Sequence, residues 1–167
     1  FHTSSGFEPE DFLSNLSTMQ KKEYRFDYEV YDQIDELEPQ DRELLNEARA
    51  VTAKAYAPYS RFLVGAVAKL KNGATVSGTN QENASYPVGI CAERALLSSA
   101  SMLHTNVPIN SMAIAYHNLD GSSGTPVSPC GMCRQALREY EDRTDQKIRL
   151  ILSGMEGKVF VIPVSSQ

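Results

Sequence analysis

The sequence has little of what nucleic-acid binding or membrane insertion requires. Its 167 residues include no tryptophan, and the 21 acidic side chains outnumber the 16 lysines and arginines. Polynucleotides are bound largely through phosphate neutralisation, and single strands also through aromatic stacking, so this balance argues against a nucleic-acid partner. No apolar run approaches the roughly 20 residues of a membrane-spanning helix, and the start lacks the pattern of a secretory signal. A small polar substrate stays compatible with the composition.

Cysteine and histidine are scarce, with three residues of each. An odd number of cysteines cannot pair off completely in an oxidising compartment, so a reducing cytoplasm is the expected location. None of the histidines stands near a cysteine in the sequence, and we interpret His104 and His117 as loop or strand-end residues. The cysteines are therefore free to hold a metal as thiolates.

The length suits one domain with a single core. We expect residues 1–23 to be a flexible leader or an arm left by expression, and residues 24–167 to be a single domain. Met19 would make a plausible native start.

Hydrophobic periodicity and turn residues predict a mixture of strands and helices. Asn72-Gly73 is typical of a two-residue type-I′ hairpin turn. The order of elements predicts an α/β fold, a three-layer α-β-α sandwich with a mixed five-stranded sheet. The expected strands are 62–70, 74–80, 111–116, 148–152 and 159–164, preceded by a short strand or extended arm at 24–31; the expected helices begin at Glu38, Cys91 and Cys130.

All three cysteines lie in two short segments. Cys91 stands two residues before Glu93, and Cys130 and Cys133 form a Cys-x-x-Cys pair. Cysteines at helix N-termini meet free amide donors and a partial positive charge, which favour the thiolate. Three thiolates can hold one zinc ion per chain and leave a fourth position for water. Glu93 can lean over that position as a proton carrier without being a ligand.

Three thiolates leave a divalent ion with a net charge near −1, which makes it a weaker acid. Lowering the pKa of water from about 15.7 to about 7 corresponds to roughly 12 kcal/mol, so the thiolate charge must be offset. Arg94 and the two helix N-termini are the candidates for this tuning.

Two other interpretations of the cysteines remain. A structural zinc site would normally be closed by a fourth Cys or His. A redox pair at Cys130 and Cys133 would leave Cys91 and Glu93 without a purpose.

Three segments together resemble cytidine deaminases of the small type with three cysteines. They are Cys91-Ala92-Glu93-Arg94, Ser128-Pro129-Cys130-Gly131-Met132-Cys133-Arg134-Gln135 and Gly78-Thr79-Asn80-Gln81-Glu82-Asn83-Ala84. Zinc deaminases in general combine Pro-Cys-x-x-Cys with a glutamate that is not a ligand. The resemblance implies hydrolytic deamination of cytidine and 2′-deoxycytidine to the uridines and ammonia, with Glu93 carrying protons between the attacking water and the pyrimidine.

The resemblance also implies how the substrate is held. Asn80 and Glu82 would hydrogen-bond the ribose hydroxyls, Phe62 would lie against the pyrimidine, and Ala92 would offer backbone groups to the base. Ala84 and Tyr86 would reach the site of a neighbouring subunit, because family members of this size are homotetramers with shared active sites. The family usually closes with a Leu-Leu-Pro stretch and a covering aromatic residue, which we expect to be absent here because the chain stops at Gln167.

Two further functions are compatible with the zinc motif. A deaminase of another aminopyrimidine nucleoside, such as blasticidin S, would share the cysteines and the glutamate, although Asn80-x-Glu82-Asn83 favours cytidine. A non-catalytic interaction domain stabilised by zinc would not need Glu93 above an open position.

Overall fold

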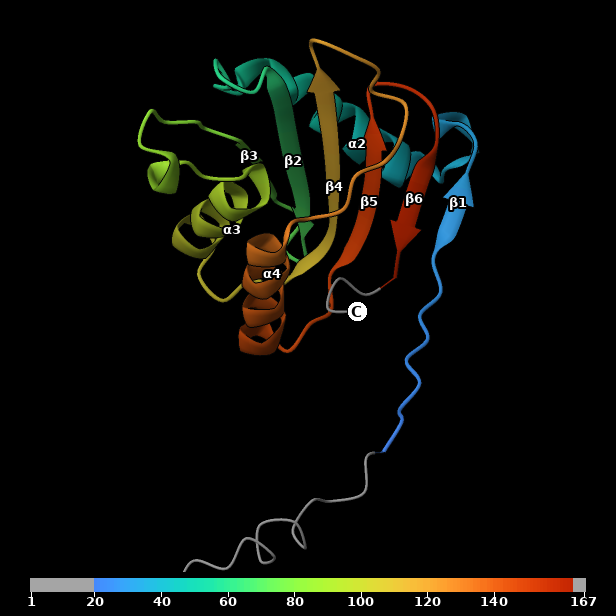
Figure 1. The fold of residues 1–167 in the computed structure, drawn as a ribbon. Helices are drawn as coiled ribbons and strands as arrows, with labels where there is room; N and C mark the ends of the chain where they lie inside the picture. The colour runs from blue at the N-terminus through green and yellow to red at the C-terminus, as the bar shows by residue number, and fades with distance from the viewer. Residues whose placement is uncertain (1–19, 164–167) are drawn as a thin grey trace, which may run out of the picture.

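A six-stranded mixed sheet forms the centre of the computed structural model, which describes residues 20–163. The strands lie in the order β1-β6-β5-β4-β2-β3, and only the β4–β5 pair is parallel. Helix α2 covers one face, and α3 and α4 lie side by side on the other (Figure 1). The strands are β1 (Glu29–Tyr31), β2 (Phe62–Leu70), β3 (Thr75–Thr79), β4 (Ile109–Asn118), β5 (Arg149–Gly154) and β6 (Val159–Ile162); the helices are α2 (Pro39–Val51), α3 (Ala92–Leu103) and α4 (Gly131–Thr144), with 3-10 turns η1 (Ile34–Glu36), η2 (Thr52–Lys54) and η3 (Tyr86–Val88).

Alternating side chains of the central strands supply two separate cores. In β4, Met112 and Ile114 face α3 and α4, whereas Ala113 and Ala115 face α2. All four are almost completely buried, as expected for a strand covered on both sides. This packing confirms the predicted three-layer sandwich.

Two details differ from the sequence expectation. The sheet has six strands rather than five, because the short segment Glu29–Tyr31 pairs with β6 at one edge. The β2–β3 connection, residues 71–74, is not a type-I′ turn. Only Gly73 in that loop has a positive φ, of 87°, whereas a type-I′ turn needs two such residues. The Gly73 amide donates to the Leu70 carbonyl at 3.0 Å. This hydrogen bond closes a four-residue turn that ends at Gly73.

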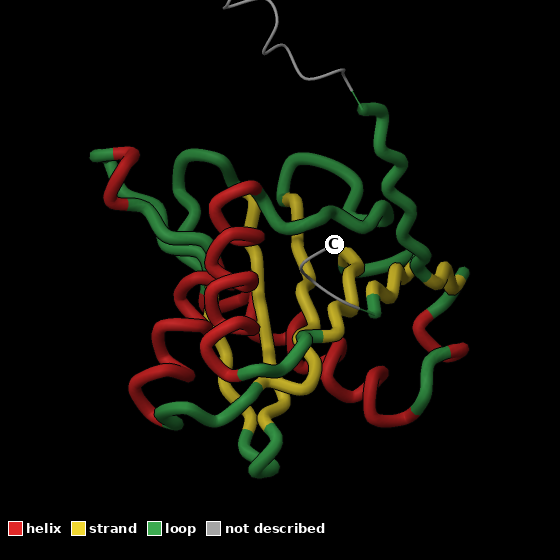
Figure 2. Tube along the Cα trace, turned by 90° about the horizontal axis from the view of Figure 1, so that it is seen from below, coloured by secondary structure: helices red, strands yellow, loops and turns green. Residues whose placement is uncertain are grey.

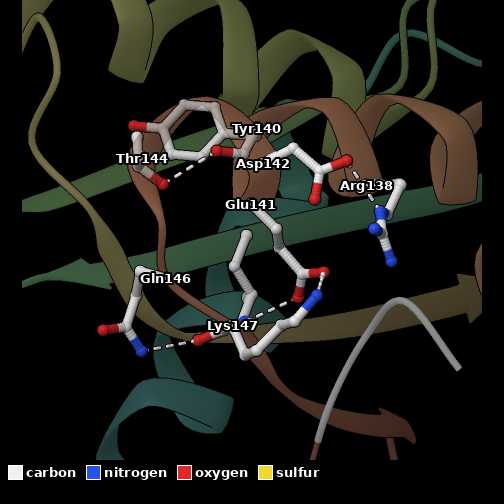
Figure 3. Close-up of polar contacts among 8 residues, drawn as sticks. Arg138, Tyr140, Glu141, Asp142, Thr144, Gln146 and Lys147 are labelled. Atoms are coloured by element: carbon white, nitrogen blue, oxygen red, sulfur yellow. Dashed lines mark hydrogen bonds and ion pairs between the residues drawn. The ribbon is translucent and has the colours of Figure 1, made fainter.

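A buried carboxylate holds the turn between α4 and β5. Helix α4 ends at Thr144. Its C-cap residue, Asp145, adopts the left-handed conformation, and Glu141 in its last turn is only 1% exposed. One Glu141 oxygen accepts the Ile148 amide at 2.7 Å, and the other lies 3.5 Å from the Lys147 ammonium (Figure 3). The start of β5 is thereby tied to the helix before it.

None of the helices within residues 20–163 has the length and apolar character needed to cross a membrane. Most of the expected leader, residues 1–19, and the chain end at 164–167 lie outside the described residues.

Candidate active site

Two helices begin at the cysteine motifs. Cys91 is the N-cap residue of α3 and Cys130 is the N-cap residue of α4, each with an extended backbone. Cys133 lies one turn into α4 and is completely buried. The first amides of each helix have no intrahelical partner, so the sulfurs stand at the positive ends of two helix dipoles.

The three sulfur atoms lie close enough to share one ion. The Sγ atoms of Cys91 and Cys130 are 4.0 Å apart, those of Cys130 and Cys133 are 3.3 Å apart, and all three lie within 4.8 Å of one another. Tetrahedral coordination with Zn–S bonds of about 2.3 Å requires sulfurs about 3.8 Å apart. The observed distances bracket this value, so the donor set fits zinc.

The electrostatics of the cluster also calls for a cation. Burial, with the nearby carboxylate of Glu93 among further causes, raises the pKa of the Cys91 and Cys133 thiols. Burial acts in the same direction on Cys130, but hydrogen bonds from the backbone of Cys133 and from neighbouring groups lower its pKa overall. Three thiolates packed this closely repel one another, so their full ionisation requires a positive partner such as a divalent ion.

Glu93 is a buried acid beside the sulfur cluster. It lies in the first turn of α3 with 6% of its surface exposed, and burial raises its pKa. The charge of Arg94 acts in the opposite direction on this pKa. A carboxyl group with a raised pKa in a recessed site is suited to accept and return a proton.

A close approach of helix and strand fixes the position of Glu93. A Cβ atom at Gly78 in β3 would lie 2.5 Å from both the Ala92 carbonyl oxygen and the Leu96 amide nitrogen. Only glycine allows α3 to lie this near the sheet. Its first turn therefore has little freedom to shift.

The sulfur cluster and Glu93 open into a cavity of about 840 Å³. Its walls come from the start of β2, the β3–α3 connection and the first turns of α3 and α4. The structure brings together in its lining every site residue named from the sequence: Phe62, Asn80, Glu82, Ala84, Tyr86, Cys91, Ala92, Glu93, Arg94, Cys130 and Cys133.

Comparisons with known proteins agree on one family. The family model described as the cytidine and deoxycytidylate deaminase zinc-binding region matches residues 38–146. The chain belongs to this family. A cytidine deaminase of Halalkalibacterium halodurans is 37% identical over 126 residues, which cover 75% of this chain and 89% of that protein. A cytidine deaminase of Mycobacterium tuberculosis is 42% identical over 97 residues, which cover 58% of this chain and 68% of that protein.

Solved structures of the same family share the fold. The crystal structure of a cytidine deaminase from Burkholderia pseudomallei superposes with a TM-score of 0.63 at 36% identity, covering 72% of this chain and 90% of that one. A second structure, of the cytidine deaminase from Mycobacterium tuberculosis, gives a TM-score of 0.54 at 34% identity, over 65% and 80% of the two chains. The α/β fold and the zinc-dependent deaminase chemistry expected from the sequence are those of this family.

Within this deaminase fold, Phe62 begins β2 and stacks on another aromatic ring. Its ring centroid is 4.7 Å from that of Tyr116, with 10° between the planes. The register pairs Val64 with Tyr116, so the two rings meet diagonally across neighbouring strands. The sequence predicts Tyr116 only as the end of a strand. Its contact with Phe62 could not be predicted, because the β2–β4 register depends on the tertiary structure.

Asn80 is tied to the start of β2, and Glu82 is tied to the turn just before that strand. The Asn80 side chain accepts the Val64 amide at 2.7 Å and donates to the Phe62 carbonyl at 2.9 Å. Glu82 Oε2 accepts the amides of Tyr59 and Ser60 at 2.9 and 3.2 Å. Each side chain keeps further hydrogen-bonding capacity, because an amide has two acceptor and two donor sites and a carboxylate has two oxygens.

Ala84 and Tyr86 lie in the segment that leads to α3. This segment projects from the body of the molecule (Figures 1 and 2). Tyr86 is 91% exposed and Val88, two residues on, is 65% exposed. Ala92, in contrast, is fully buried at the first position of α3. Among the predicted site residues, Ala92, Glu93 and Cys133 are therefore buried, whereas Ala84, Tyr86 and Cys130 are exposed.

Proposed function

We propose that this protein catalyses the hydrolytic deamination of cytidine and 2′-deoxycytidine to uridine and 2′-deoxyuridine, with release of ammonia. One observation carries the proposal: three cysteine sulfurs with zinc-like spacing and one buried glutamate share a cavity of nucleoside-compatible size. Cys91, Cys130 and Cys133 would hold the metal. When bound there, zinc would supply Lewis acidity that lowers the pKa of a coordinated water.

Glu93 moves the protons of the reaction. Its carboxylate accepts a proton from the attacking water and delivers it to N3 of the pyrimidine as the C4–O bond forms. It then takes the proton of the new C4 hydroxyl and passes it to the amino group, so that the C4–N bond breaks, the C4 carbonyl forms and ammonia leaves. Its burial supports this role, because burial raises the pKa of Glu93 and so favours the protonated form that returns the proton.

The remaining cavity residues bind the nucleoside or adjust the charge at the metal site. Phe62 lies against the base, Ala92 offers its backbone, and Asn80 and Glu82 hydrogen-bond the sugar hydroxyls. Arg94 offsets part of the charge of the three thiolates, and its effect on the pKa of Glu93 supports a place in the same electrostatic network.

The protein acts as a homotetramer in the cytoplasm, with Ala84 and Tyr86 reaching a neighbouring subunit's site. The exposure of Tyr86 and Val88 supports this assembly, since large apolar side chains that stand out from one chain mark a contact surface. Gel filtration tests it: the wild type elutes as a tetramer and Tyr86→Ala loses activity. A monomer with full activity would remove both residues from the site.

Absorbance assays of cytidine and 2′-deoxycytidine turnover test the function directly. Glu93→Gln is expected to lower kcat by about 10²- to 10⁴-fold, the usual contribution of general acid–base catalysis. Its zinc content should stay at the wild-type level. Glu139→Gln, an exposed glutamate on α4, is the matched control and keeps full activity. A zinc-loaded wild type that leaves both nucleosides unchanged contradicts the proposal, and blasticidin S in the same assay tests the other aminopyrimidine substrate.

A further inference from the structure

Tyr116 is a buried aromatic residue near the end of β4, next to the cavity. Only 4% of its surface is exposed, and it is not among the residues that line the cavity. Ile114, two residues earlier and therefore on the same face of the strand, does line it. Because β2 and β4 are neighbours in the sheet, Tyr116 can support a cavity residue of β2 from the adjacent strand (Figure 1).

The ring of Tyr116 stacks on the ring of Phe62, the first residue of β2. The two centroids are 4.7 Å apart and the planes differ by 10°. This separation falls within the range of about 4.5–7 Å in which aromatic pairs attract each other. Phe62 lines the cavity. The part of its ring that Tyr116 leaves uncovered is therefore the part that a bound base can contact.

The hydroxyl of Tyr116 fixes the orientation of its own ring. It donates to the Thr125 carbonyl at 2.7 Å, in the loop between β4 and α4. Val127 and Ser128, further along this loop, line the cavity. A buried ring that is also held by a hydrogen bond at its tip has little freedom to move, so it offers Phe62 a rigid support.

The backbone of Phe62 is held separately from its ring. Its amide donates to Ser60 Oγ at 3.1 Å, and its carbonyl accepts from the Asn80 side chain at 2.9 Å. These hydrogen bonds place the Cα atom but leave the two side-chain torsions free. The direction of the ring then depends on what it packs against, and Tyr116 supplies a parallel ring for that contact.

We propose that Tyr116 is a positioning residue that holds the Phe62 ring in the orientation that receives the pyrimidine, and so contributes to the affinity for the base. This inference rests on the proposed function, which places Phe62 against the base. Tyr116 acts through Phe62 and does not touch the substrate. Its effect therefore depends on the base of the ligand and not on the sugar hydroxyls.

Kinetics of Tyr116 variants test the proposal. Tyr116→Leu removes the stacked ring and keeps an apolar side chain. It is expected to raise KM for cytidine about two- to ten-fold, the fold-change that corresponds to one aromatic pair. The value of kcat should change little, because a base held equally in the ground state and the transition state affects only KM. Tyr116→Phe keeps the ring and should restore the wild-type KM. An equal rise in KM for both variants would overturn the inference, since the hydroxyl rather than the stack would then be responsible.

Tyr140→Leu is the matched control for a loss of stability. Tyr140 is 3% exposed, its hydroxyl donates to the Val107 carbonyl at 2.8 Å, and it does not line the cavity. Both leucine variants should be less stable in urea, but only Tyr116→Leu should raise KM. The same rise in KM for Tyr140→Leu would give Tyr116 a general structural role and overturn the inference.

A second substrate tests whether Tyr116→Leu displaces the whole start of β2. Such a displacement would also move Asn80, which is hydrogen-bonded to the Phe62 carbonyl and is assigned to the sugar. If only the ring moves, KM should rise by the same factor for cytidine and for 2′,3′-dideoxycytidine, which lacks both sugar hydroxyls. A larger rise for cytidine would overturn the inference.

A double-mutant cycle identifies the residue through which Tyr116 acts. In a Phe62→Leu background, Tyr116→Leu should change KM for cytidine far less than it does alone. Additive effects of the two substitutions would show that Tyr116 does not act through Phe62.

Binding of uridine, measured by calorimetry, separates this inference from the proposed function. A wild type that binds uridine but does not turn over cytidine refutes the proposed function alone. The role of Tyr116 is then decided by uridine affinity. Binding to Tyr116→Leu that is about two- to ten-fold weaker supports it. Equal affinities of the two proteins, or no uridine binding by the wild type, overturn it.

Discussion

The contact between α3 and β3 at Gly78 gives a sharp test of how the fold positions the carboxylate of Glu93, the proposed proton carrier. A methyl group at this position would lie 2.5 Å from the Ala92 carbonyl oxygen and 2.5 Å from the Leu96 amide nitrogen. Ordinary contact begins at 3.4 Å, so Gly78→Ala forces the helix and the strand apart by 3.4 − 2.5 = 0.9 Å. Both obstructing atoms belong to the helix backbone and cannot rotate away.

Two losses follow from this displacement. Overpacking of a well-packed contact costs typically 1–3 kcal/mol, and the rigid backbone on both sides puts the expected destabilisation at about 3 kcal/mol. Glu93 and Cys91 move with the first turn of α3, and a misplacement of about 1 Å can lower catalysis by about 10²-fold. Gly78→Ala is therefore expected to be folded, less stable and nearly inactive.

Urea denaturation and kcat/KM for cytidine measure the two effects separately. Gly131→Ala is the matched control, because a Cβ at Gly131 meets nothing within 4 Å and the residue does not have a positive φ. This substitution at the start of α4 should stabilise the protein by about 0.4–1 kcal/mol by restricting the unfolded chain. Wild-type stability and kcat/KM in Gly78→Ala would refute the reasoning that this contact holds the site in place.

Three further outcomes are expected. Cys133→Ala should abolish stoichiometric zinc binding, measured by elemental analysis, together with activity; a full zinc complement would exclude Cys133 as a ligand. Glu141→Ala leaves the buried Ile148 amide unpaired and should cost about 1–3 kcal/mol in urea denaturation, whereas Glu139→Ala on the exposed side of α4 should change stability little. Equal effects would show that the buried carboxylate does not hold the turn. The pKa of Glu82 is lowered in the folded state, so its stabilising contribution is present above the usual value of about 4.3 and is lost as the pH falls through the lowered pKa. The stability difference between wild type and Glu82→Gln should therefore shrink from pH 6 to pH 3, and a difference that grows would contradict this sign.

Local patterns in the sequence were sufficient to predict most of the architecture. The apolar strands, and the helix starts at Cys91 and Cys130, follow from short-range periodicity and the properties of helix ends. The three layers then follow from the alternation of strands and helices, and the sheet confirms them. The two cysteine motifs and Glu93 could be grouped from spacing and chemistry alone, before any contact between α3 and α4 was known.

Contacts that depend on the tertiary structure could not be predicted in the same way. The sixth strand arises because three residues pair with β6, about 130 residues later in the chain, and no local pattern specifies that partner. The stacking of Phe62 on Tyr116 and the amides that hold Glu82 depend equally on the register between distant segments. The β2–β3 loop differs for a local reason, since Asn72 does not adopt the positive φ that the type-I′ turn requires.

The strand order has a practical consequence for handling the protein. β1 and β3 form opposite edges of the sheet, with four strands between them, and the cavity lies at the β3 side. At about 4.8 Å per strand, the two edges are roughly 24 Å apart. The segment before β1 leaves the sheet at the edge away from the cavity (Figure 1). An affinity tag, a fluorophore or a surface linkage joined through that segment therefore leaves the mouth of the cavity unobstructed.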